Sequence, residues 1–243
     1  WGRITYKYKP APNDQNRMKT ATTYDTHVAC QGINASLHDA LLDLGFHDDG
    51  LVGRYVSMVD GVAVSSCPLI GIHMSKKTNT RNQSLHTLDQ TRNLLEHYKM
   101  VGYGHSEVTL SREILSGNGH IDATVEPNFL PLQPSTSDAN KKWDVHIAIP
   151  HTNLNEELRQ VMEKYGFDWI DLQKKDRNVN RVYSAQGICS LDVGKRLYAE
   201  VVDWLRDMNV PSAKIKLERY VGMYRIGNPE IVPPVVDRVT FKS

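Results

Sequence analysis

The sequence predicts an α+β protein, a tandem duplication of a ferredoxin-like βαββαβ unit. Each unit is expected to be an antiparallel sheet with helices on one face, and an irregular linker joins the two. Three observations predict this class: a short motif that occurs twice, a helix-like pattern after each copy, and an alternating strand that closes each unit. The motif is the strongest of the three, because internal self-similarity is the signature of a repeated structural unit.

The repeated motif is D-x-H-h-A-h, where h is an apolar residue. It reads Asp-Thr-His-Val-Ala-Cys at residues 25–30 and Asp-Val-His-Ile-Ala-Ile at residues 144–149. Each copy is followed by a segment of helical period that ends at Gly45 or at Gly166, at nearly the same distance from the motif histidine. A glycine just past a helix can take the left-handed conformation that ends it. Each copy therefore indicates a first strand followed by a first helix.

The later part of each unit shows the same order of patterns. They are strand-like at 54–59, 68–74 and 181–188, helix-like at 87–98 and 193–208, and strand-like again at 107–114 and 214–221. The resulting order, βαββαβ, is that of ferredoxin-like units.

The chain of 243 residues is expected to divide into five segments. They are an extended basic and aromatic arm (1–20), the first repeat (21–114), the linker (115–141), the second repeat (142–224) and an extended C-terminal tail (225–243). The linker is rich in Gly, Pro, Ser and Asn, as loops are.

Composition is that of an ordinary soluble protein, with 40% hydrophobic and 23% charged residues. No apolar run approaches the ~20 residues of a membrane-spanning helix, so no membrane partner is expected. The three cysteines are too few and too scattered for a disulfide framework, which favours a reducing, cytoplasmic location. The sequence lacks the phosphate loop, the dinucleotide-binding glycine pattern, the serine-hydrolase elbow and the HExxH motif, which argues against those enzyme classes.

The motif also predicts where polar side chains gather. Alternation within 144–149 places the apolar residues on the helix face, so Asp144 and His146 are expected on the open face of the sheet, as are Asp25 and His27. In a ferredoxin-like sheet the last strand lies beside the first. The open-face residues of the last strands are Glu107, Thr109, Ser111 and Glu113 in one unit and Lys214, Lys216, Glu218 and Tyr220 in the other.

If the two open faces meet across a cleft, His27 and His146 can act as an acid–base pair on a phosphorylated or otherwise anionic small molecule. The residues assigned to the substrate are Lys214, Lys216, Tyr220, Thr109 and Ser111, with Asp25 and Asp144 as orienting partners. No metal ligand is assigned, and the cofactor is left open. The plain alternative is a solvated sheet face on which each histidine pairs with a neighbouring carboxylate.

Two other functions also fit the sequence. The first is a non-catalytic RNA-binding module, since the arm (1–20) interleaves basic residues with Trp1, Tyr6 and Tyr8. The second is a structural or assembly protein whose extended tails join copies of the chain into a homo-oligomer.

The pattern of one histidine per unit resembles that of the two-histidine phosphoesterases, which carry His-h-Thr/Ser-h in each of two lobes and cleave RNA or cyclic phosphates. Here Ala29 and Ala148 occupy the hydroxyl position. The stretches THVACQG and VHIAIPH also resemble the opening of vicinal-oxygen-chelate modules, in which a strand histidine binds a metal. That resemblance implies Glu107, Glu113 and Glu218 as candidate carboxylate ligands.

Overall fold

The computed structural model describes residues 23–59, 62–67, 71–114, 143–176, 178–188, 191–210 and 212–227. Its strands are β1 (Tyr24–Gln31), β2 (His47–Val59), β3 (Val62–Cys67), β4 (Gly71–Thr78), β5 (Gly102–Ile114), β6 (Trp143–Pro150), β7 (Asp168–Gln173), β8 (Val179–Ile188) and β9 (Lys214–Ile226). Its helices are α2 (Ala35–Asp43), α3 (Arg81–His97), α4 (Glu156–Lys164) and α5 (Leu191–Asp207), with a 3-10 turn, η2, at His151–Asn153.

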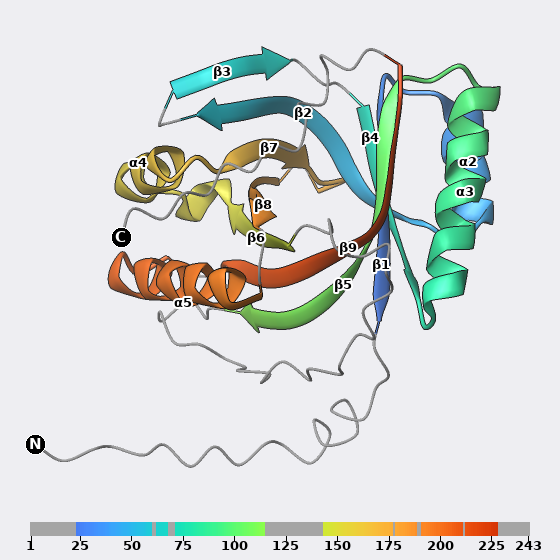
Figure 1. The fold of residues 1–243 in the computed structure, drawn as a ribbon. Helices are drawn as coiled ribbons and strands as arrows, with labels where there is room; N and C mark the ends of the chain where they lie inside the picture. Colours follow the sequence, from blue (N-terminus) through green and yellow to red (C-terminus); the bar gives the residue numbers. More distant parts are fainter. Residues whose placement is uncertain are drawn as a thin grey trace, which may run out of the picture.

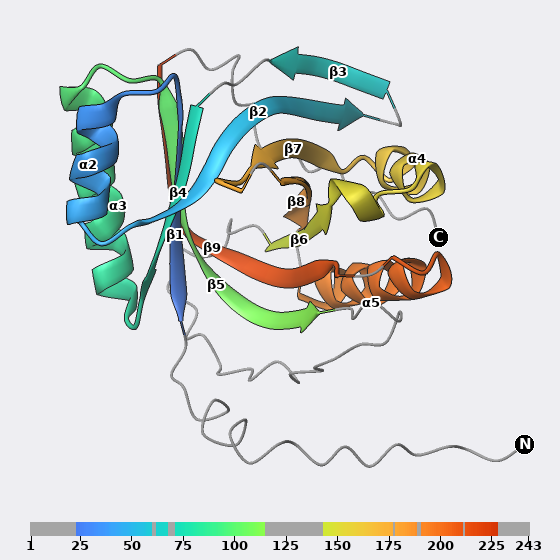
Figure 2. The same cartoon turned by 180° about the vertical axis from the view of Figure 1, so that it is seen from behind.

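The strands form one closed antiparallel barrel (Figure 1, Figure 2). Eight strands follow one another in the order β2-β4-β1-β5-β9-β6-β8-β7, and β7 pairs with β2 to close the ring. β3 lies outside the ring as a hairpin extension of β2. The prediction of ferredoxin-like sheets, each with helices on one face, is therefore wrong.

The physical reason for this error lies at the strand edges. The first half contributes the run β2-β4-β1-β5 and the second the run β7-β8-β6-β9, so each run would end in two edge strands. An edge strand carries unpaired backbone N–H and C=O groups. Pairing β5 with β9 and β2 with β7 satisfies both sets of groups and closes the barrel.

Two helices cover the outside of each half, α2 and α3 on the first and α4 and α5 on the second (Figure 1). Asn34 and Asn155 cap α2 and α4, each with a side-chain oxygen that accepts a backbone N–H three residues on. Both helices are followed by a glycine in the left-handed region, Gly45 at φ 84° and Gly166 at φ 76°. In the described residues no helix is both long and apolar enough to cross a membrane.

Alternation along each strand divides its side chains between the helices and the barrel interior. On β6, Val145, Ile147 and Ile149 belong to the apolar core that packs with α4 and α5. The opposite faces of the strands point into the barrel, where many side chains are polar. The face expected to be open is thus enclosed, and Asp25 and His27 are only 6% and 7% exposed.

The expectations for the arm, the linker and most of the tail concern segments outside the described residues. At the tail's start, β9 continues to Ile226.

A candidate active site inside the barrel

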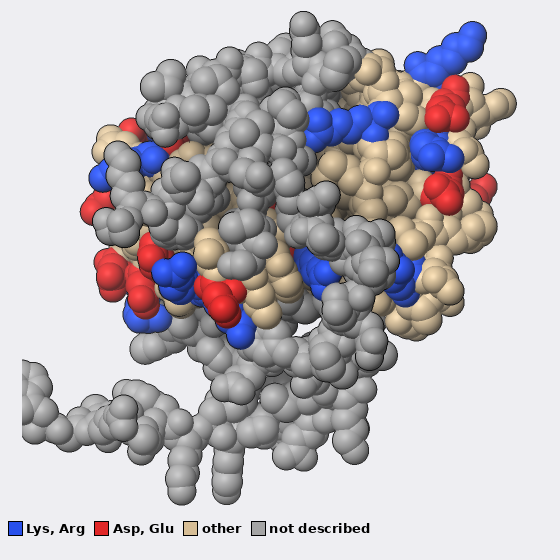
Figure 3. All heavy atoms as spheres, viewed as in Figure 1, with Lys and Arg blue, Asp and Glu red and all other residues tan. Residues whose placement is uncertain are grey.

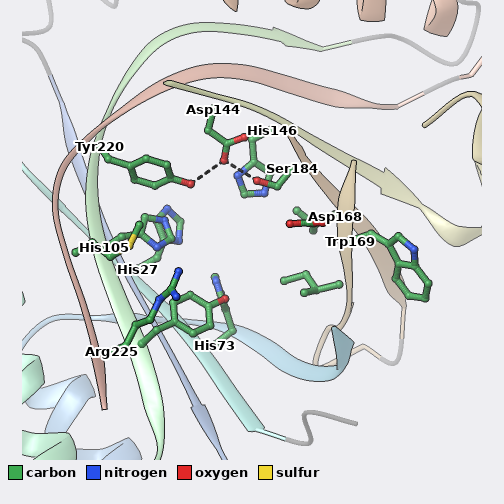
Figure 4. A pocket seen from close by; sticks show the side chains of 14 residues that line it. His27, His73, His105, Asp144, His146, Asp168, Trp169, Ser184, Tyr220 and Arg225 are labelled. Atoms are coloured by element: carbon green, nitrogen blue, oxygen red, sulfur yellow. Dashed lines mark hydrogen bonds between the residues drawn. The ribbon is translucent and has the colours of Figure 1, made fainter. Parts of the chain in front are cut away.

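A cavity of about 70 Å³ lies inside the barrel. Its lining comes from β1, β4 and β5 of the first half and from β6, β7, β8 and β9 of the second. Figure 4 shows histidines, carboxyl groups and hydroxyl groups directed into this space from several strands. A cavity of this size can hold a few water molecules or a small ligand.

The first half contributes a cluster of two histidines and one glutamate, His27, His105 and Glu107, here named the His-Glu cluster. His27 on β1 lies directly opposite His105 on β5, with their rings stacked at a centroid distance of 5.0 Å. Glu107 is fully buried, with Oε1 2.9 Å from His27 Nε2 and Oε2 3.1 Å from His105 Nε2. One carboxylate therefore contacts both imidazoles.

Two further carboxylates lie close to these histidines. Asp25 Oδ2 is 3.5 Å from His27 Nε2. On β4, the His73 ring lies 5.4 Å from the His27 ring, and its Nδ1 is 3.2 Å from Asp49 Oδ2. His27 thus lies between His73 and His105, within reach of two acids.

Opposite charges outweigh burial in the His-Glu cluster. Burial opposes the charge on His27, but Glu107 and Asp25 raise its pKa well above the usual value. Burial also opposes the charge on Glu107, yet His105 and His27 hold the pKa of that carboxyl well below its usual range. His27 and Glu107 therefore form a charged pair at neutral pH.

The second half contributes a carboxyl group, Asp144, whose pKa is raised, whereas that of Glu107 is lowered. Asp144 on β6 is 1% exposed, and its Oδ2 accepts hydrogen bonds from the hydroxyls of Tyr220 at 2.9 Å and Ser184 at 2.7 Å (Figure 4). Its Oδ1 has no hydrogen-bond partner among the described residues. Burial raises the pKa of Asp144 to about 6; His146 opposes that rise and Glu218 adds to it. Asp144 can take or release a proton near neutral pH.

His146, two residues further along β6, also lines the cavity. Its Nδ1 lies 3.3 Å from Oε2 of the buried Glu218. The other oxygen of Glu218 contacts Lys216 Nζ at 3.0 Å and accepts from the Thr109 hydroxyl at 3.2 Å. Burial opposes the charge on His146, but the hydrogen bond and charge of Glu218 raise its pKa. His146 can therefore donate a proton in the same cavity in which Asp144 can accept one.

The structure brings His27 and His146 to one cavity, each against its own carboxylate, Glu107 or Glu218. Tyr220 also lines the cavity and holds Asp144.

The other residues assigned to a substrate are placed differently. Lys216 is paired with Glu218 and lies 3.9 Å from Asp25, so its charge is already compensated. Lys214 is exposed at the start of β9. For Ser111 only the backbone is described, in β5 opposite Leu217.

Five residues that line the cavity were not assigned to the site from the sequence: His73, His105, Asp168, Ser184 and Arg225. His105 could have been found, because it lies two residues before Glu107 and so shares its strand face. The last strand of the first unit was expected to begin at Glu107, whereas β5 begins at Gly102. Ser184 lies beside the motif residues because β8 pairs with β6. The sequence of β8 alone does not specify that pairing.

No known family model and no curated protein matches this sequence. Neither the expectation of an enzyme acting on an anionic small molecule nor that of an RNA-binding module gains support from a relative. On the face seen in Figure 3, basic and acidic side chains of the described residues are interspersed and do not separate into patches of one sign. With no matching family or relative, the cavity and its titratable side chains are the basis for inferring the function of this protein.

Proposed function

We propose that this protein is an enzyme that carries out acid–base chemistry on a small molecule bound in the barrel cavity. The observation that carries the proposal is the pair Asp144 and His146, which face one cavity from the same strand with different proton affinities. Neighbouring titratable groups whose environments set their pKa values differently are typical of acid–base sites.

The contacts of each group assign its role. Above about pH 6, Asp144 is a carboxylate held by Tyr220 and Ser184 through Oδ2, and its unpartnered Oδ1 can accept a substrate proton. His146 is oriented and kept protonated by Glu218, so it can donate a proton. Asp144 takes the place of His27 in the pair expected from the sequence, because His27 is engaged by Glu107.

The cavity also limits the substrate. Its volume of about 70 Å³ favours a small molecule, and the free oxygen of Asp144 favours one with an O–H or N–H group at the reacting centre. Lys216 is already paired with Glu218, so the proposal does not require a phosphate group on the substrate. The substrate class is therefore small and polar, wider than the anionic class expected from the sequence.

The test is an unbiased activity screen. The wild-type protein, Asp144→Asn and His146→Gln are each incubated with a mixture of small metabolites, and mass spectrometry follows consumption and formation. Compounds turned over by the wild type should react on the order of 10²–10⁴-fold more slowly with either variant, as for a lost general acid or base. Asp207→Asn, at an exposed position at the end of α5, is the matched control and should keep the wild-type rate. A wild type that changes no compound, or variants that act at its rate, would overturn the proposal.

A further inference from the structure

We propose that the His-Glu cluster, His27, His105 and Glu107, binds a divalent first-row transition-metal ion. The inference goes beyond the acid–base function and does not rest on it, because metal binding is measured without a substrate.

The donor atoms are already spaced as metal ligands are. In a tetrahedral site with bonds of about 2.0–2.2 Å to nitrogen and oxygen, neighbouring donor atoms lie roughly 3.3 Å apart. Here the two histidine Nε2 atoms lie 2.9 Å and 3.1 Å from the oxygens of Glu107, and the three residues offer ligand atoms that all lie within 4.8 Å of one another. Small side-chain rotations would let one ion contact all three.

The same atoms lack aligned hydrogen bonds. Glu107 is 0% exposed and His27 is 7% exposed, yet both carboxylate oxygens and both ring nitrogens have no hydrogen-bond partner among the described residues. The close contact of His27 with Glu107 is an ion-pair distance without hydrogen-bond geometry. Because buried polar groups in folded proteins are almost always satisfied, an unsatisfied cluster indicates a bound ion or water. A cation that displaces the proton of His27 to solvent and bonds to the two imidazoles and the carboxylate would satisfy the cluster.

The ligand types indicate the class of metal. Two imidazoles and one carboxylate form the ligand set of catalytic zinc sites and of non-haem iron(II) sites, whereas calcium and magnesium prefer oxygen alone. His27 and His105 line the cavity, so the remaining coordination positions would face water or a substrate. A metal here would bring a Lewis acid into the cavity that contains Asp144.

The other candidate groups are weaker. Asp144, His146 and Glu218 could also converge on an ion, but the Lys216 ammonium lies 3.0 Å from Glu218 and would repel a cation. The group of His27, Asp49 and His73 shares His27 with the His-Glu cluster, so the two groups draw on the same imidazole ring. His73 and Asp49 are instead positioned to support His27 from the β4 side.

The test uses the full chain stripped of metal with a chelator. Titration with Zn²⁺ by calorimetry should show one ion bound per chain, and Co²⁺ should give the intense visible bands of four- or five-coordinate cobalt. Glu107→Gln and His105→Ala should each weaken Zn²⁺ binding on the order of 100-fold or more. His86→Ala, at an exposed histidine of α3, is the matched control and should bind as the wild type does.

A measurement on the unaltered protein covers the case in which a variant fails to fold. The proton NMR spectrum of the Co²⁺ form should contain two strongly shifted, exchangeable imidazole N–H signals, one from each histidine ligand. Absence of stoichiometric binding, absence of those signals, or unchanged binding by the folded variants would overturn the metal site. The acid–base proposal would survive that result, since its own test is turnover by Asp144→Asn.

Discussion

The pKa of Asp144 is shifted toward neutral pH, which suits a residue that exchanges protons with a substrate. Burial inside the barrel raises its pKa from 3.8 to about 6. Its surroundings include the charged groups His146, Glu218 and Glu107, along with the Tyr220 hydroxyl. Burial disfavours the carboxylate more than His146 favours it, so the folded state holds a proton that the unfolded chain would release.

The first prediction is that the proton held by Asp144 makes the stability of the folded protein depend on pH. Between about pH 4 and pH 6 the folded protein binds more protons at Asp144 than the unfolded chain does, so this residue's contribution to stability falls as pH rises through that window. Each unit of pKa difference is worth about 1.4 kcal/mol, so the rise from 3.8 to about 6 corresponds to a loss of roughly 3 kcal/mol. Asp144→Asn removes the titration. The unfolding free energy of the variant relative to the wild type, from urea titrations, should therefore rise by about that amount from pH 4 to pH 7. Parallel pH profiles for the two proteins would contradict the raised pKa.

At this scale the sequence predicted part of the site. Alternation placed Asp25, His27, Asp144 and His146 on the face away from the helices, and the structure has them there. Their burial could not be predicted, because alternation distinguishes the two faces of a strand but does not show whether the polar one meets water or the inside of a barrel.

At the scale of the element, a side-chain pair adds to the backbone ladder that joins β7 to β8 in the barrel wall. Asp171 and Arg181 lie opposite each other in the strand register. Arg181 donates Nε–H to Oδ1 at 2.8 Å and Nη2–H to Oδ2 at 2.9 Å, and its guanidinium lies 3.6 Å from the centre of the Trp169 ring. At 8% exposed, Arg181 is shielded enough for this pairing to matter.

The second prediction concerns Arg181→Lys. Lysine keeps the charge but cannot make the two-pronged contact or stack on Trp169, so we expect a loss of about 1–2 kcal/mol in unfolding free energy. Arg92→Lys, on the exposed surface of α3 beside Asp89, is the matched control and should change the unfolding free energy by less than about 0.5 kcal/mol. Equal losses in urea titrations of the two variants would show that the paired geometry is unimportant.

At the scale of the whole molecule, closure of the barrel makes one cavity from two halves. The seam between β2 and β7 runs beside Gly50, which lies at φ 125° next to a register shift in β2. A Cβ at this position would lie 2.2 Å from the carbonyl oxygen of Gln173 on β7. Only glycine allows the two strands to approach so closely here.

The third prediction is that Gly50→Ala weakens the seam. The left-handed backbone and the clash with Gln173 together should cost on the order of 3 kcal/mol. Amides of β2 and β7 should lose hydrogen-exchange protection before those of β1 and β4 do. Gly45→Ala, where φ is also positive but the nearest atom to a Cβ is 3.8 Å away, is the control and should cost about 1 kcal/mol. Identical losses at the two positions would contradict the close approach at the seam.

At this scale the sequence did not predict the two seams that close the barrel, β2 with β7 and β5 with β9. Local patterns predicted a strand with a helix after it at both His27 and His146, but missed β3 in the first half. The pairings of β5 with β9 and of β2 with β7 are made by backbone groups, which carry no side-chain signature. The barrel was therefore not predicted from sequence, and neither was the enclosed cavity.

The most direct test of one cavity built by both halves is a contact across the β5–β9 seam. His105 of the first half and Tyr220 of the second meet edge to face inside the barrel, with ring centroids 5.1 Å apart. An aromatic NOE spectrum of selectively labelled protein should show cross-peaks between the ring protons of these two residues. Cross-peaks from each ring only to its own half, with both rings accessible to a soluble paramagnetic probe, would contradict the closed barrel and its shared site.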